Sequence, residues 1–221
     1  MTTSDKISEY FDHKASSFDA IYSGQKGAHS QLWDRLTRQN IYRRLEFTMQ
    51  ALYPLTDKKI LDVGCGSGRY CIEVAKAGAK EIVGIDISPK MLEIAKNLAV
   101  NYDVSSRCQF LQSDVLDMRD TFDDVIAMGF FDYVQETEEV FSHLRTLILG
   151  KMVASFPRMG APRVPFRKCW LAIQGCPVYF YTKSEISLLC QKTGFVCNAI
   201  IKSGPIYLLI AEPDLKFARK I

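Results

Sequence analysis

The stretch that decides the fold is ILDVGCGSGRY, residues 60–70. A short apolar run is followed by three glycines that alternate with small residues, Gly64, Gly66 and Gly68. Glycine adopts positive φ without steric cost, and it lets a ligand lie directly against the backbone. The pattern therefore predicts a buried strand, a tight turn that can hold a ligand, and a helix that begins near Arg69.

The spacing of these glycines separates the turn from two familiar nucleotide sites. Gly64-x-Gly66-x-Gly68 is not the G-x-G-x-x-G of dinucleotide-binding folds, and it lacks the Lys-Ser/Thr of a P-loop. Taken alone, the turn is equally consistent with a purely structural role. Its meaning depends on what surrounds it.

Apolar strand-like segments alternate with helix-like segments along the rest of the chain, which predicts a doubly wound α/β fold with a mostly parallel seven-stranded sheet. The last two strands are joined only by Ser203–Pro205, a connection too short for a crossover, so one strand near the C-terminus is antiparallel. Helices are expected at 69–78, 88–101, 135–148 and 182–193, and strands at 59–64, 81–86, 108–114, 122–129, 152–157, 195–203 and 206–213.

Length and composition predict one domain, residues 1–221, with 48% hydrophobic and 24% charged residues. We divide it into an N-terminal helical lid (1–52), a core (58–156), an insert (157–181) and a C-terminal helix with a hairpin (182–221). Seven cysteines without a C-x-x-C pair, no secretory h-region and no apolar run that could span a bilayer favour a reduced, cytoplasmic setting.

Acidic residues end three successive strands, at Asp62, Asp86 and Asp114. The carboxyl ends of parallel strands meet at one edge of the sheet, where α/β folds bind ligands. Asp86 follows the last glycine by some eighteen residues and could accept hydrogen bonds from ribose hydroxyls, whereas Asp114 could accept one from an adenine amino group. The alternative for a single acid is a helix cap, and Asp86 or Ser88 could cap a helix that begins at Pro89.

ILDVGCGSGRY, VGIDIS (83–88) and LQSDV (111–115) resemble motifs I, II and III of class I S-adenosylmethionine-dependent methyltransferases, and FDDVIAMGFFDYV (122–134) resembles their motif IV segment. The resemblance covers about residues 58–156. YFDHKASSFDAIY (10–22) is similar to the lid of small-molecule enzymes of the ubiquinone-biosynthesis and magnesium-protoporphyrin methyltransferase kind. The resemblance implies S-adenosylmethionine (SAM) as cofactor and S-adenosylhomocysteine (SAH) as its product.

The resemblance also implies a role for each matching position. Methionine would lie on the Gly64–Gly66 backbone, with Asp62 orienting its amino group through the loop. The ribose would bind Asp86. The implied cofactor contacts are Asp62, Gly64, Cys65, Gly66, Gly68, Asp86, Ile87, Asp114, Val115, Met128, Gly129, Tyr10 and Tyr22. For Met128 and the two tyrosines, ordinary packing is an equal alternative.

Methyl transfer from a sulfonium is an in-line substitution in which positioning supplies much of the rate, and a general base helps when the acceptor is a hydroxyl. The candidate catalytic residues are Asp132, Tyr133 and His13. Related small-molecule enzymes often carry Glu-His where this chain has Asp132-Tyr133, which puts a histidine base there in doubt. The cysteines do not have zinc-finger spacing, so no metal is expected.

The insert is long for a connection, and it lies within an acid-free stretch between Glu139 and Glu185. Its basic and aromatic side chains predict an acidic, aromatic small-molecule acceptor. The alternative is that the bases merely balance the acidic block 103–139. The predicted substrate-binding residues are Arg158, Arg163, Arg167, Trp170, Tyr179 and Tyr181.

Two other functions stay open at this point. A methyltransferase for RNA or nucleosides would suit the basic and aromatic residues, although a net charge of +3 is modest for a nucleic-acid partner. A non-catalytic SAM-binding partner subunit is less consistent with an intact glycine loop. The expected oligomeric state is a monomer or a homodimer.

Overall fold

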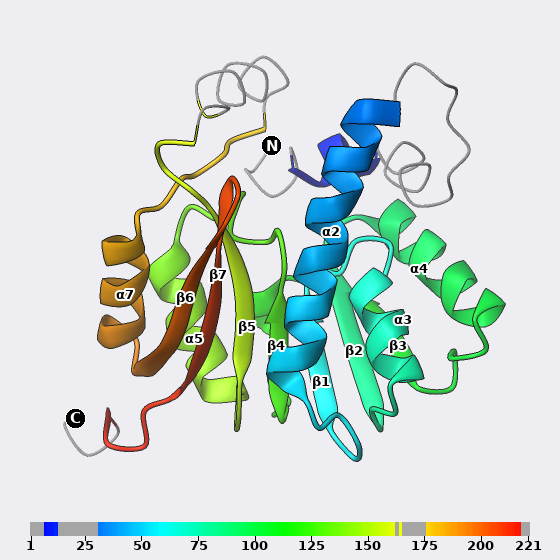
Figure 1. The fold of residues 1–221 in the computed structure, drawn as a ribbon. Helices are drawn as coiled ribbons and strands as arrows, with labels where there is room; N and C mark the ends of the chain where they lie inside the picture. The colour runs from blue at the N-terminus through cyan, green and yellow to red at the C-terminus, as the bar shows by residue number, and fades with distance from the viewer. Residues whose placement is uncertain (1–6, 13–30, 162–163, 165–175, 218–221) are drawn as a thin grey trace.

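The structure, a computed structural model, describes residues 7–12, 31–161, 164 and 176–217, and of residues 31–40 the backbone alone. A short helix over residues 7–12 precedes the fold shown in Figure 1. The elements that follow are α2 (Gln31–Leu52), β1 (Lys59–Val63), α3 (Arg69–Lys76), β2 (Glu81–Asp86), α4 (Pro89–Asn101), β3 (Cys108–Gln112), the 3₁₀ turn η2 (Val115–Asp117), β4 (Asp124–Ala127), α5 (Thr137–Leu147), β5 (Met152–Pro157), α7 (Lys183–Lys192), β6 (Phe195–Ser203) and β7 (Ile206–Pro213).

The seven strands form one sheet in the order β3-β2-β1-β4-β5-β7-β6. β1 to β5 are parallel, and β1 pairs with both β2 and β4, so the strand order reverses beside it. β7 runs antiparallel to β5 on one side and to β6 on the other. This confirms the predicted mostly parallel seven-stranded sheet. Its antiparallel strand is β7, which lies between β5 and β6, two strands that run in the same direction.

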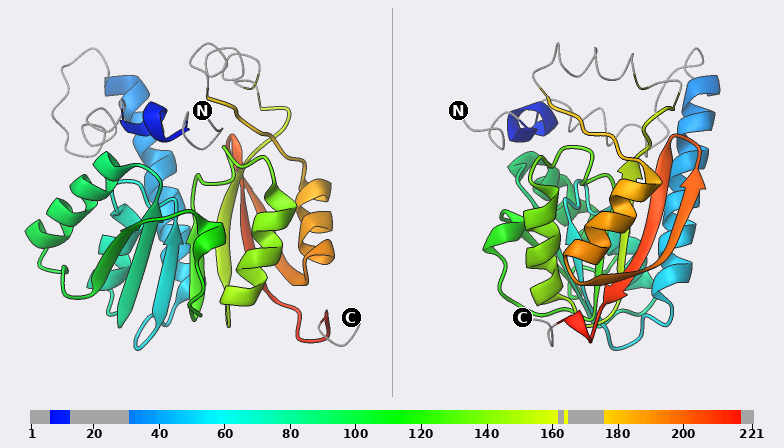
Figure 2. Two further views of the ribbon diagram at one scale, coloured as in Figure 1. Left: turned by 180° about the vertical axis from the view of Figure 1, so that it is seen from behind. Right: turned by 90° about the vertical axis from the view of Figure 1, so that its left-hand side faces the viewer.

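Helices cover both faces of the sheet, each over its own apolar core. On the face turned to the viewer in Figure 1, α2, α3 and α4 pack against a cluster that includes Cys71, Val74 and Ala95. Figure 2 shows α5 and α7 on the opposite face, where Phe141 and Ile186 belong to the second cluster. The strands buried on both sides are the continuous apolar runs seen in the sequence.

Local signals set the ends of the helices within two residues of the predicted bounds. α3 begins after Gly68, whose φ is 74°. A Cβ atom there would lie 2.9 Å from both Ala95 and Phe110, so only glycine lets α3 pack this close. Of the two candidates for capping α4, Ser88 is its N-cap residue: its hydroxyl accepts a hydrogen bond from the backbone N–H of Met91 at 3.2 Å.

The N-terminal segment contacts the sheet's carboxyl edge. The Ser8 hydroxyl donates to the Ile87 carbonyl at 3.0 Å, and the Asp12 carboxylate accepts hydrogen bonds from the Ser88 hydroxyl and the Lys90 N–H. The helix 7–12 therefore lies against the turn between β2 and α4. Of the described helices, none has the length and apolarity needed to cross a membrane.

A charged cluster ties three segments together at the opposite edge of the sheet. The Asp124 side chain is 2% exposed; it pairs with Lys58 and accepts a hydrogen bond from the Lys151 N–H at 2.6 Å. Lys58 also donates to the Leu52 carbonyl at 3.0 Å, at the end of α2. Asp124 therefore joins the starts of β4 and β5 to the connection between α2 and β1.

We predict that Asp124→Asn lowers the free energy of unfolding by about 2 kcal/mol, because two hydrogen bonds to a buried charge are weakened. Urea denaturation followed by circular dichroism measures the change. The control is Asp120→Asn: Asp120 pairs with Lys59 at the surface and is 66% exposed, so its loss should change the stability by less than about 0.5 kcal/mol. Equal effects of the two variants would contradict the assignment.

Candidate functional site

A cavity of about 640 Å³ lies at the carboxyl ends of β1, β2 and β4. The glycine loop after β1, the turn after β2, the start of η2 and the loop after β4 form most of its wall. Ile7 and Phe11 of the N-terminal helix and Arg44 of α2 complete it. The cavity thus sits where the strand order reverses, the position at which open α/β sheets bind ligands.

The glycine loop presents bare backbone to this cavity. Gly64 and Gly66 have φ values of 65° and 53°, in the left-handed region. A Cβ atom on Gly64 would lie 2.9 Å from Phe130, whereas one on Gly66 would meet nothing within 4 Å. Gly64 is thus required by packing inside the protein. Gly66 faces open space, where a ligand can approach the chain.

Asp86 connects the loop to the next strand. Its carboxylate accepts hydrogen bonds from the Gly66 N–H at 2.8 Å and from the Ser88 N–H at 2.9 Å. Burial raises the pKa of Asp86; the backbone hydrogen bonds oppose this shift, and the nearby charge of Asp12 adds to it. A carboxylate has about four acceptor sites, so two backbone donors leave capacity for ligand hydroxyls.

Ile87, Asp114 and Val115 line the cavity beside Asp86. Asp114 Oδ1 accepts a hydrogen bond from the Leu116 N–H at 2.9 Å and so caps η2. The helix cap considered from the sequence is therefore present. It occupies one carboxylate oxygen of a residue that also borders the cavity, so the cap and a ligand contact are compatible.

Asp62 lies beneath the loop and does not border the cavity. Its side chain is 1% exposed, and Oδ2 accepts a hydrogen bond from the Cys71 thiol at 3.2 Å. Burial raises the pKa of Asp62 to about 7; the hydrogen bond from Cys71 opposes the shift, and the charge of Asp86 favours it. Asp62 therefore titrates near neutral pH.

Arg44 is the residue that sequence reasoning missed. Nη1 lies 3.9 Å from the position of a Cβ atom on Gly129, at the end of β4, and the side chain lines the cavity. Its Nε is buried and has no hydrogen-bond partner among the described residues. No motif marks this position, because only the packing of α2 across the sheet brings it to the strand ends.

The loop after β4 supplies the candidate catalytic residues. Met128, Gly129, Asp132 and Tyr133 all line the cavity, and Asp132 is 7% exposed. The Tyr133 ring meets Phe11 of the N-terminal helix edge to face, with centroids 5.2 Å apart. His13 and Tyr22 lie outside the described residues. Tyr10 contacts Phe11 through its ring and is not part of the cavity wall.

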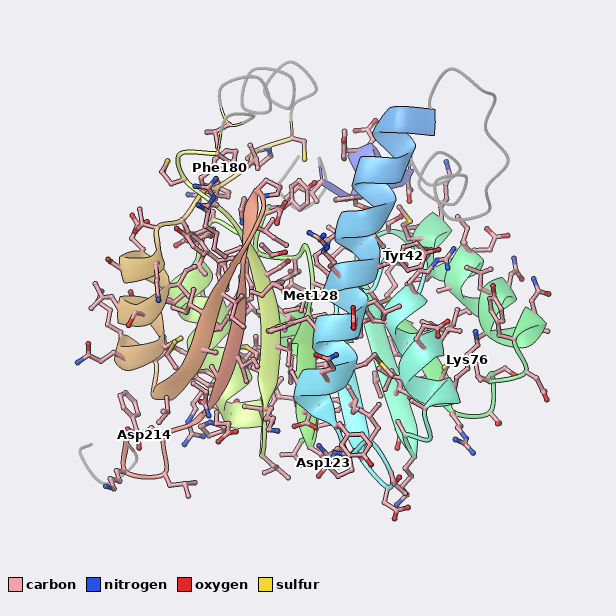
Figure 3. All side chains as sticks on the ribbon, viewed as in Figure 1. Tyr42, Lys76, Asp123, Met128, Phe180 and Asp214 are labelled. Atoms are coloured by element: carbon pink, nitrogen blue, oxygen red, sulfur yellow. The ribbon has the colours of Figure 1, made fainter. Side chains whose placement is uncertain are left out.

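The described part of the insert lies beside the loop after β4, where the Tyr179 N–H donates to the Asp132 carbonyl at 2.9 Å, although none of its described residues lines the cavity. Arg158 Nε donates to the Gly204 carbonyl at 3.1 Å. The Tyr179 hydroxyl donates to Gln135 at 3.2 Å, and the Tyr181 hydroxyl hydrogen-bonds Thr137 at 2.8 Å. Tyr179 and Tyr181 line a second hollow of about 510 Å³, and neighbouring Phe180 lies well apart from Met128 in Figure 3. Arg163, Arg167 and Trp170 lie outside the described residues.

Electrostatically, the cavity combines both signs. Arg44 and Arg69 reach it from α2 and α3, whereas five acidic residues border it: Asp86, Asp114, Asp132, Glu136 and Glu139. The described residues contain no group of three or more His, Cys, Asp or Glu side chains arranged to hold a metal ion. Such a cavity suits an organic ligand that carries both cationic and anionic groups.

Comparison with known proteins agrees with this geometry. Residues 55–162 match the family model described as a methyltransferase domain. The ubiquinone biosynthesis O-methyltransferase of Histophilus somni is 32% identical over 119 residues, 51% of this chain and 50% of that protein. The ajmaline N-methyltransferase of Rauvolfia serpentina is 36% identical over 85 residues, 37% of this chain and 29% of that protein. The chain spans about half the length, or less, of these curated relatives.

Solved structures show the same fold. The magnesium protoporphyrin IX methyltransferase of Synechocystis, solved with bound SAH, superposes with a TM-score of 0.77 at 21% identity and covers 96% of this chain and 100% of its own. The geranyl diphosphate C-methyltransferase of Streptomyces coelicolor reaches 0.74 at 13% identity, with 97% and 99% covered.

The family match falls on the segment that carries the glycine loop and the strand-end acids, and the chain superposes on a solved methyltransferase over 96% of its length. The resemblance drawn from residues 60–70, 83–88 and 111–115 is confirmed. Residues 55–162 are a methyltransferase domain, and the described chain has the Rossmann-like fold of the superposed methyltransferases.

Proposed function

We propose that this protein transfers a methyl group from SAM to a small, acidic, aromatic metabolite. The observation that carries the proposal is the composition of one cavity. The glycine loop and Asp86 lie on one side of it, and the residues that line the rest include four aromatic rings and two arginines: Phe11, Tyr70, Phe130, Tyr133, Arg44 and Arg69.

The cofactor fits the first part of this wall in one orientation. The adenine lies between Ile87 and Val115 near Asp114, and the ribose hydroxyls hydrogen-bond to Asp86. The methionine chain crosses the open backbone at Gly66 toward the end of β4. Its carboxylate then meets the guanidinium of Arg44, a side chain that lines the cavity.

The chemistry takes place beside Met128 and Gly129. The acceptor atom attacks the methyl carbon opposite the sulfur, the carbon–sulfur bond breaks, and its electron pair stays on sulfur to give SAH. When the acceptor is a hydroxyl, its proton passes to a base, and Asp132 or Tyr133 in the adjoining loop takes this role. Burial excludes water and holds the reacting atoms in line.

Aromatic rings and arginines point to the acceptor class. Planar rings pack favourably against Phe11, Tyr70, Phe130 and Tyr133. Arginine presents a rigid fork of donors that matches a carboxylate or phosphate, so Arg69 supplies a second anion site beside the one assigned to SAM. Basic residues of the insert, Arg158, Arg163 and Arg167, remain proposed contacts for the outer part of the acceptor, with Trp170, Tyr179 and Tyr181 packing on its apolar body.

A labelling experiment tests the proposal. The protein is incubated with methyl-labelled SAM and either acidic aromatic metabolites or total RNA. Label is expected in the metabolite fraction. Asp86→Ala should weaken SAH binding by about 1–3 kcal/mol and reduce labelling, because it removes hydrogen bonds to the ribose. Label that enters only RNA, or that is unchanged in Asp86→Ala, would contradict the proposal.

Arg44→Met should lower the affinity for SAH about tenfold or more, through the loss of a charged hydrogen bond to the methionine carboxylate. Its affinity for 5′-methylthioadenosine, which lacks that carboxylate, should change less than about twofold. Isothermal titration calorimetry measures both affinities, and the exposed neighbour on the same helix gives the control, Arg43→Met. A similar loss for both ligands would remove the carboxylate assignment.

Asp62 should make the unfolding free energy depend on pH. Its pKa is raised to about 7 in the folded state, against about 3.9 when unfolded, so between these values the folded state binds more protons. Stability contributed by this group is therefore lost as the pH rises from about 4 to 7. The wild-type protein should lose stability relative to Asp62→Asn over this range and run parallel to it above pH 7; urea unfolding at several pH values measures the difference. Parallel curves throughout would refute the buried, raised-pKa state of Asp62.

A further inference from the structure

Two thiols face each other beneath the glycine loop. Cys65 lies between the loop glycines, lines the cavity and is 7% exposed, and Cys71 is completely buried in the first turn of α3. A Cβ atom built on Gly84 of β2 would lie 2.9 Å from Cys71 Sγ and 3.0 Å from Cys65 Sγ. The two sulfur atoms therefore flank one point, kept open because residue 84 has no side chain.

The surroundings make the two thiols chemically unequal. For Cys65, the hydrogen bond from Cys71 lowers the pKa; burial and the charges of Asp62 and Asp86 outweigh it, so the net shift is upward. Burial, followed by the hydrogen bond with Cys65 and the charge of Asp62, raises the pKa of Cys71 well above its usual value. Cys65 is thus the more acidic thiol, and it is also the one that borders the cavity.

Asp62 lies next to Cys71, the second thiol of the pair. Its Oδ2 accepts the Cys71 Sγ–H hydrogen bond at 3.2 Å, so a proton acceptor is already in contact with the group that must lose a proton. The raised pKa of Asp62, about 7, suits a carboxylate that takes up a proton at neutral pH. The methyl transfer proposed above does not use Cys71 or its hydrogen bond to Asp62.

We propose that Cys65 and Cys71 form a reversible disulfide when a hydroperoxide enters the empty cavity, and that this bond switches off cofactor binding. The switch rests on the SAM site proposed above. The Cys65 sulfur attacks one oxygen of the peroxide, the O–O bond breaks, and the other oxygen takes up the thiol proton and leaves as alcohol or water, so that Cys65 becomes a sulfenic acid. Cys71 then attacks that sulfur and its proton passes to Asp62; the departing hydroxide takes up a proton from solvent in the cavity and leaves as water as the S–S bond forms.

A disulfide between Cys65 and Cys71 would displace the glycine loop on which the cofactor is proposed to lie. Cys65 is held by two backbone hydrogen bonds, from its own N–H to the Ile85 carbonyl at 2.9 Å and from the Gly68 N–H to its carbonyl at 2.9 Å. Drawing its sulfur toward α3 moves the loop whose backbone receives the methionine chain. It also removes the thiol donor from Asp62, which leaves a buried carboxyl without that hydrogen bond.

The chain also offers internal controls. Cys108 Sγ lies 3.9 Å from the Cys71 carbonyl and is the nearest competing partner for Cys71 that the structure describes. Cys190 and Cys197 form a second thiol pair, between α7 and β6, where no cofactor loop is involved. Cys197→Ala is therefore a variant in which the proposed disulfide should form unchanged.

Peptide mapping tests the bond directly. Trypsin cuts after Lys59, Arg69 and Lys76, so Cys65 and Cys71 fall on separate peptides, residues 60–69 and 70–76. After treatment of the full chain with hydrogen peroxide and blocking of free thiols, mass spectrometry should find these two peptides linked, in the wild type and in Cys197→Ala but not in Cys71→Ser. Saturating SAH should slow the linkage, because the cofactor covers Cys65. The absence of the linked peptide, or linkage of 70–76 to the Cys108 peptide (108–119) in its place, would overturn the proposal.

Calorimetry tests the switch. The oxidised wild type should bind SAH about tenfold or more weakly than the reduced protein, and a thiol reductant should restore the affinity. Cys71→Ser should bind equally before and after peroxide. Unchanged SAH affinity in the linked protein would overturn the switch. Peptide mapping and calorimetry both work without a methyl acceptor, so their results do not depend on the proposed substrate class. If the reduced protein bound no SAH, the proposed cofactor would be refuted instead.

Discussion

The site depends on three places where a Cβ atom does not fit. Side chains at Gly64, Gly68 and Gly84 would each come within 2.9 Å of a neighbouring side chain. At Gly68 this closeness lets α3 approach α4 and β3, and at Gly64 it lets the loop after β4 close against the glycine loop. The segments that form the cavity wall therefore pack together only because these positions have no side chain. Gly66 has a different role, since it leaves the backbone open to a ligand.

The sequence predicted the parts of the molecule that rest on local patterns. Buried parallel strands are continuous apolar runs, and Ser88 with Pro89 marks the start of α4, so the sheet and the helix bounds could be read without coordinates. Asp86 could be assigned to the strand edge for the same reason. Its hydrogen bond to Gly66 links residues 20 apart in the chain, however, and needed the structure.

What could not be predicted depends on packing between distant segments. Arg44 enters the cavity only because α2 crosses the sheet, and nothing in its local sequence distinguishes it from Arg43. Asp62 was expected to orient the methionine amino group through the loop, which stays a prediction; that it lies one layer below the loop, where burial raises its pKa, could be seen only in the structure. The assignment of the basic insert to the substrate came from composition and stays a prediction; the hydrogen bond from Arg158 to the turn between β6 and β7 depends on the fold and could not be predicted from composition.

The position of β7 has a consequence for how the chain folds as it is synthesised. β6 is made before β7, yet among the described strands it pairs with β7 alone, and β7 lies between it and β5. The five parallel strands can therefore assemble while the C-terminal part is still emerging, but β6 has no backbone partner until residues 206–213 arrive between it and β5. Until then both β5 and β6 present open strand edges, and such edges are sites of mispairing and aggregation. Of the described strands, the last to be made is the one that joins β6 to the rest of the sheet.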